Sequence, residues 1–94
     1  MEPWLLTPHA RARMQQRGIP ESALDALLDF GRAAHDHRGA EIVFFDKRAR
    51  RRVERVLGNL ELRRLERFFG TYAVLGVEGE IRTVGHRIRR VRHA

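Results

Sequence analysis

The sequence contains no cysteine, which excludes disulfide bonds, iron–sulfur clusters, cysteine zinc sites and thiol nucleophiles. It also lacks any run approaching the roughly 20 apolar residues that a transmembrane helix needs. The first ten residues, MEPWLLTPHA, have neither the basic start nor the long apolar stretch of a signal peptide. We therefore expect a cytoplasmic protein that has no membrane partner.

Lysine is almost absent, because Lys47 is the single lysine among 19 basic residues. Against them stand 12 acidic residues, which gives a formal net charge of +7. The 94 residues are 43% hydrophobic, too apolar for a disordered chain, and this length allows one domain over 1–94. Arginine binds phosphate through two parallel hydrogen bonds, which lysine does not. An arginine bias also follows from a GC-rich genome, but that does not explain where the charge lies.

The positive charge lies in two blocks. Residues 47–67 hold nine bases and three acids, and residues 82–94 hold five arginines and no acid, whereas the rest of the chain is net negative. Clustered arginine is typical of nucleic-acid-binding proteins. A solvated helix face with a frayed tail, or a docking surface for an acidic protein, would show the same pattern. The predicted phosphate contacts are Arg50, Arg51, Arg52, Arg55, Arg87, Arg89, Arg90 and Arg92.

The N-terminal part of the chain predicts two helices. Thr7 and Pro8 are typical of a helix start, and this helix runs to about Arg17. A second helix over 20–30 follows and is stopped by Gly31.

The remainder predicts two β-hairpins with a basic helical segment between them. The first hairpin has strands over 33–38 and 41–46, and the second, 71–77 and 80–86, turns at Glu78-Gly79. The strand with Ile42-Val43-Phe44-Phe45 is apolar on both faces, which favours a central position. The helical insertion over 47–69 is expected to break in two, with Gly58 as C-cap and Asn59 as N-cap. The expected fold is α+β in the order ααββααββ, followed by a basic tail over 88–94.

The first predicted helix carries a possible catalytic stripe. His9, Arg13 and Arg17 are four residues apart and share one side of the helix. A histidine beside two guanidinium groups suits phosphodiester cleavage without a metal, because the imidazole moves a proton and the arginines stabilise the charge that develops. His86 would complete an acid/base pair if it approached His9.

Two other interpretations of these residues stay open. The acidic stripe formed by Glu21, Asp25 and Asp29 would neutralise Arg13 and Arg17 and lock the two helices together. His35 and His37 share a face of their predicted strand, but no third ligand stands at a spacing typical of a metal site. We therefore expect no metal and no cofactor.

The opening LTPHARARMQQRGIPESALDALLDFG resembles the bacterial domain of unknown function 4258 family, whose members open with a HAxxRMxxRGI pattern. The stretch TVGHR, from Thr83 to Arg87, looks like the closing strand of that family. Similar domains occur among RelE-like and barnase-like bacterial toxins, which are metal-independent ribonucleases. By position, the resemblance implies catalytic roles for His9, Arg13 and Arg17, with Thr83 and His86 as weaker candidates.

The sequence therefore leaves three functions to compare. The most specific hypothesis is a toxin-like, metal-independent endoribonuclease. One of His9 and His86 would be the base and the other the acid, and Arg13 or Arg17 would stabilise the transition state. The second is a non-catalytic nucleic-acid-binding protein whose arginines contact RNA or DNA phosphates. The third is an arginine-rich protein-interaction module with an acidic protein partner.

Overall fold

The computed structural model describes residues 5–35 and 38–86 of the chain. This part is α+β, with four α-helices and a four-stranded antiparallel sheet, and its order confirms the predicted ααββααββ arrangement. The longest helix has 11 residues, and none in the described ranges has the length and apolar character of a membrane span. The elements are α1 (Pro8–Gln16), α2 (Glu21–Phe30), β1 (Arg32–His35), β2 (Glu41–Phe44), α3 (Lys47–Leu57), α4 (Asn59–Leu65), the 3₁₀ turn η1 (Glu66–Phe68), β3 (Thr71–Leu75) and β4 (Ile81–His86).

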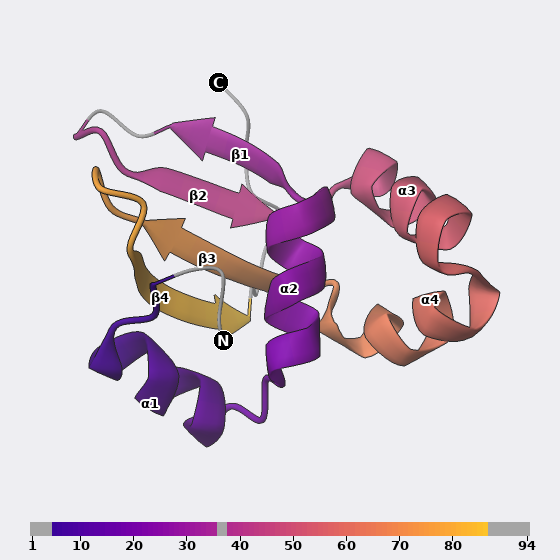
Figure 1. Cartoon of the computed structure of the whole chain (residues 1–94), viewed down its shortest axis with the longest axis horizontal. Helices are drawn as coiled ribbons and strands as arrows, with labels where there is room; N and C mark the ends of the chain where they lie inside the picture. Colours follow the sequence, from indigo (N-terminus) through magenta and orange to yellow (C-terminus); the bar gives the residue numbers. More distant parts are fainter. Residues whose placement is uncertain (1–4, 36–37, 87–94) are drawn as a thin grey trace.

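The sheet follows chain order, β1-β2-β3-β4, and every neighbouring pair of strands is antiparallel. The predicted central position of β2 is confirmed, because β2 pairs with β1 on one side and β3 on the other. Figure 1 shows α2 crossing one face of the sheet and α1 lying beside β4, while α3 and α4 lie beyond the end of the sheet where β2 ends and β3 begins.

The position of α1 is set by a short stretch that runs alongside β4. The Thr7 N–H donates to the Ile81 carbonyl at 3.1 Å, and the Ile81 N–H donates to the Leu5 carbonyl at 2.8 Å. The Thr7 hydroxyl then accepts the Ala10 N–H at 3.2 Å, which confirms the predicted N-cap. Gly18, at φ +64°, lets the chain turn after the helix ends.

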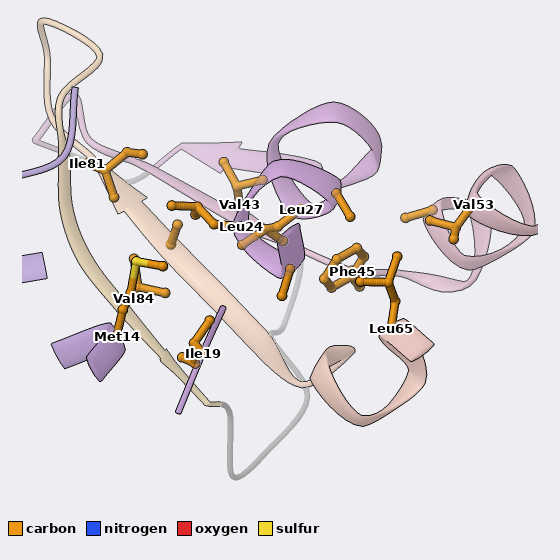
Figure 2. Packing of buried hydrophobic residues seen from close by; sticks show 14 of the residues in the cluster. Met14, Ile19, Leu24, Leu27, Val43, Phe45, Val53, Leu65, Ile81 and Val84 are labelled. Carbon is orange, nitrogen blue, oxygen red and sulfur yellow. The ribbon is translucent and has the colours of Figure 1, made fainter. Parts of the chain in front are cut away.

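The hydrophobic core lies between the helices and one face of the sheet. Val43, Ala73 and Val84 stand opposite one another on β2, β3 and β4, and all three belong to the buried cluster. In Figure 2, Met14 lies beside Val84, whereas Phe45 and Leu65 extend the cluster towards α3. Because side chains alternate along a strand, their neighbours lie on the opposite face of the sheet. That face carries Ile42, Phe44, Tyr72, Val74, Thr83 and Gly85.

The basic insertion forms two helices that meet at Gly58. The Asp46 carboxylate accepts the Ala49 N–H at 2.7 Å and caps α3, which buries Ala49 and Val53. Gly58 has φ +89° and caps both the end of α3 and the start of α4. The prediction that Asn59 is the N-cap is wrong, because the chain reverses within one residue and Asn59 is already the first residue of α4. A left-handed backbone of this kind favours glycine.

The predicted turn at Glu78-Gly79 is confirmed and joins β3 to β4. Gly79 has φ +82°, and the Gly76 N–H donates to the Glu80 carbonyl at 2.8 Å. The Glu80 carboxylate closes the turn by accepting hydrogen bonds from backbone N–H groups and from the Arg82 guanidinium. The pKa of this carboxyl is lowered, chiefly by the Glu80 N–H itself and then by the charge of Arg82.

Gly31 is the residue on which the junction of α2 and β1 depends. A Cβ at this position would meet the Leu27 carbonyl oxygen and would lie 2.8 Å from the Cγ1 atom of Val43. We therefore expect Gly31→Ala to lower the free energy of unfolding by about 1–3 kcal/mol, measured by urea denaturation. Gly85→Ala is the control, because the nearest atom there is the flexible end of Arg17. Equal stability of the wild type and Gly31→Ala would contradict this packing.

Candidate nucleic-acid interface

Three arginines of α3 form one wall of a groove. Arg48, Arg52 and Arg55 are four and three residues apart, so they fall within about 60° of arc on one side of the helix. The buried line of α3, Ala49 and Val53, borders this side and holds it against the rest of the protein. The three guanidinium groups are therefore presented together by a helix whose orientation is fixed.

The other wall of the groove is the junction between α2 and β1. Phe30 ends α2, Gly31 makes the close approach to Val43, and Arg32 begins β1. The groove has a volume of about 550 Å³, within the range typical of pockets for small organic ligands. Its lining residues are Phe30, Gly31, Arg32, Asp46, Arg48, Ala49, Arg52 and Arg55.

The groove holds four arginines and one acidic residue. Arg32, Arg48, Arg52 and Arg55 form no ion pair within residues 5–35 and 38–86. The carboxylate of Asp46 accepts the hydrogen bond that caps α3. A concave surface with an excess of guanidinium groups attracts anions, and the fork of the guanidinium group matches the oxygens of phosphate or carboxylate.

An aromatic ring restricts one of the groove arginines, Arg52. The Arg52 guanidinium carbon lies 5.6 Å from the centre of the Phe30 ring, at the groove. Two similar contacts occur outside the groove, where Arg50 lies over Phe69 at 5.5 Å and Arg67 over Phe68 at 5.3 Å. Each contact restricts a side chain that is otherwise flexible.

The predicted phosphate contacts divide into three groups. Arg52 and Arg55 line the groove, whereas Arg51 does not. Arg50 is turned to α4 and η1, where its Nη2 donates to Glu66 Oε1 at 3.1 Å. The predicted contacts in the C-terminal tail lie outside the described residues; they are Arg87, Arg89, Arg90 and Arg92.

Two groove arginines, Arg32 and Arg48, are not among the phosphate contacts that the sequence predicts. Arg48 is one helical turn before Arg52, so the spacing of four residues was a usable signal. Arg32 lies far away in sequence, at the start of β1, and joins the groove only because α2 packs against α3. No local pattern in the sequence indicates that contact.

A second polar cluster lies where the end of α1 meets β4. A Cβ on Gly85 would lie 2.5 Å from Arg17 Nη1 and 3.2 Å from Tyr72 Oη, so these two atoms are within 5.7 Å of each other. The His86 Nε2 atom lies 3.4 Å from the Arg17 carbonyl oxygen. Because a carbonyl only accepts, Nε2 donates, and Nδ1 is left to act as the base in the neutral ring. Gly85 thus makes room for the Arg17 guanidinium beside the Tyr72 phenol, and the His86 imidazole lies at the Arg17 backbone.

The predicted catalytic residues are only partly brought together. His9 is exposed in the first turn of α1, whereas His86 contacts the carbonyl at the opposite end of that helix. Eight residues of helix separate these ends by about 12 Å, so the predicted proton exchange between His9 and His86 is wrong in this geometry. Arg13 is half-buried between them, and Thr83 lies on the same face of β4 as Gly85. Tyr72 is a member of the second cluster that was not predicted as a site residue.

The acidic stripe of α2 does not neutralise the α1 arginines. Arg13 and Arg17 form no ion pair in the described part of the chain. The two helices are instead linked by Arg11 Nη1 and Glu21 Oε1, 3.8 Å apart. The alternative in which Glu21, Asp25 and Asp29 pair with Arg13 and Arg17 is therefore wrong.

Within the described ranges, no three histidine or acidic side chains come together in a way that would hold a metal ion. His35 is exposed on β1, and His37 lies outside the described residues.

Comparisons with protein-family models, with curated proteins and with solved structures each give no match. The resemblance to the domain of unknown function 4258 family therefore stays a prediction.

Proposed function

We propose that this protein binds nucleic acid through the groove between α3 and the α2–β1 junction. The proposal rests on four arginines, Arg32, Arg48, Arg52 and Arg55, which line one groove of about 550 Å³ and form no ion pair within the described part of the chain. A chain of phosphates supplies several negative charges at short spacing, which a single carboxylate does not. The overall charge of +7 favours association with such a polyanion at long range.

The test of this proposal is the salt dependence of RNA binding. Each phosphate contact with a single strand contributes about −0.7 to the slope of log affinity against log salt concentration. If all four groove arginines contact phosphates, we expect a slope of about −2.8, measured by fluorescence anisotropy with a labelled 12-nucleotide RNA. Affinity then falls by about 50-fold between 50 and 200 mM salt.

Two results would count against nucleic-acid binding. One is a slope near zero, which would mean that phosphate contacts do not hold the complex together. The other is tight binding of an acidic protein with no affinity for RNA or DNA, which would favour the protein-interaction module. Three apolar side chains near the corner between α3 and α4 suit that alternative, since Val56, Leu57 and Leu60 are 42–72% exposed.

A second candidate function, metal-independent cleavage of RNA, is suggested by the Arg17 guanidinium beside Tyr72 and by the contact of His86 with the Arg17 carbonyl. In this reaction the 2′-hydroxyl gives its proton to Nδ1 of His86 and its oxygen attacks the neighbouring phosphorus. The bond from phosphorus to the 5′-oxygen breaks, and the Tyr72 hydroxyl gives a proton to that oxygen. The Arg17 guanidinium stabilises the negative charge that develops on the phosphoryl oxygens. The products are a 2′,3′-cyclic phosphate and a free 5′-hydroxyl.

A further inference from the structure

We infer that the groove binds a single strand and stacks one base on the Arg52 guanidinium. This inference rests on the proposed function, because it specifies which form of nucleic acid the groove takes. Its basis is that the Arg52–Phe30 contact lies between Arg48 and Arg55 along α3, and neither of these two arginines pairs with an acidic group among the described residues.

The Arg52 guanidinium is a flat group in a restricted orientation. Phe30 is half-buried at the end of α2, and its ring lies 5.6 Å from the guanidinium carbon. A cation over a ring face is attracted by the ring, which limits the rotation of a long side chain. Arg52 also lines the groove, and a guanidinium group can stack on a nucleobase, so we place the base on the side of Arg52 away from Phe30. A base reaches such a platform only when it is unpaired and turned out of a helix.

The other groove arginines lie where the flanking phosphates of a stacked nucleotide would pass. Arg48 precedes Arg52 by one helical turn, about 6 Å along the axis, and Arg55 follows by about 4.5 Å. Both side chains are exposed and line the same groove. This arrangement of a stacking plane between two cations is typical of single-strand binding, in which a basic channel follows the backbone and planar groups hold the bases.

The two other arginine–aromatic contacts do not offer the same site. Arg50 is held by Glu66 as well as by Phe69, so its charge is already compensated. Arg67 lies over Phe68 in η1 and does not line the groove. Arg52 therefore combines an aromatic contact, a guanidinium without an ion pair to residues 5–35 or 38–86, and a place in the groove.

The experiment compares three probes: a 12-nucleotide single-stranded RNA, its duplex, and inorganic polyphosphate, all at 50 mM salt. We expect the single strand to bind at least tenfold more tightly than the duplex. Arg52→Lys keeps the charge but removes the plane, so it is expected to weaken single-strand binding about tenfold and polyphosphate binding only about twofold. The control Arg51→Lys is expected to change single-strand affinity by less than twofold, because Arg51 does not line the groove.

Phe30→Leu provides an independent test, because it keeps an apolar side chain and removes the ring beneath Arg52. We expect a loss of single-strand affinity similar to that of Arg52→Lys, with both variants checked for folding by circular dichroism. Equal affinities for single strand and duplex, or equal effects of Arg52→Lys on RNA and polyphosphate, would overturn this inference while the proposed function stands. Failure of all three probes to bind would instead contradict the proposed function itself.

Discussion

Reversing two charges in the groove, with Arg48→Glu and Arg55→Glu together, is expected to lower RNA affinity by about 100-fold or more at 50 mM salt. Each substitution removes a charge-assisted hydrogen bond to phosphate, and such bonds contribute about 1.5–3 kcal/mol. Each also places a carboxylate near the remaining phosphates, which adds repulsion. Because two contacts are lost, the salt slope should fall by about 1.4. Fluorescence anisotropy measures both quantities with the same RNA.

The matched control is the double variant Arg63→Glu, Arg64→Glu on α4. It changes the net charge by the same amount, but both side chains are exposed and neither lines the groove. Long-range attraction weakens in this control, so we expect a loss of about fivefold or less. Equal losses in the two double variants would show that net charge, and not the groove, determines binding.

If the second cluster cleaves RNA, His86→Ala is expected to slow cleavage in EDTA by about 10²- to 10⁴-fold, the range typical of a lost general base. His86 contacts the end of α1 through the Arg17 carbonyl and is exposed, so its removal leaves the core of the sheet unchanged. The measurement is the rate of appearance of the 2′,3′-cyclic phosphate end on a labelled RNA.

His9→Ala is the control for this experiment. Eight residues of helix separate His9 from Arg17, whose carbonyl His86 contacts, by about 12 Å, so we expect the cleavage rate of His9→Ala to stay within twofold of the wild type. A loss as large as that of His86→Ala would restore the predicted pairing of the two histidines. A wild-type protein that does not cleave RNA in EDTA would remove the second candidate function.

The fold was largely predictable from local signals. Thr7 and Pro8 begin α1, and the apolar run in β2 indicates a central strand, because each of these signals acts within a few residues of the feature it determines. Asn59 was misassigned because Gly58 alone makes the reversal between α3 and α4. The lack of space for a side chain at Gly31 was not predictable. It arises because the Leu27 carbonyl and the Val43 side chain approach this position once α2 has packed on the sheet.

The candidate sites were less predictable, because they join residues that are distant in sequence. The spacing of Arg48, Arg52 and Arg55 gives one wall of the groove, but Arg32 arrives from a different element. The stripe predicted on α1 included Arg17, which lies beside Tyr72 in the structure. It did not show that β4 ends at the C-terminal end of α1, which depends on the pairing of residues 5–7 with Ile81. That pairing separates His86 from His9 and brings it to Arg17.

The most direct test of the groove is an NMR titration that follows the arginine side-chain Nε–Hε signals as single-stranded RNA is added. We expect the signals of the four groove arginines to shift first and furthest, because their guanidinium groups would contact phosphate and base. These residues are Arg32, Arg48, Arg52 and Arg55. Larger shifts at Arg63, Arg64 and Arg67, with the groove signals unchanged, would contradict the assignment of nucleic-acid binding to this groove.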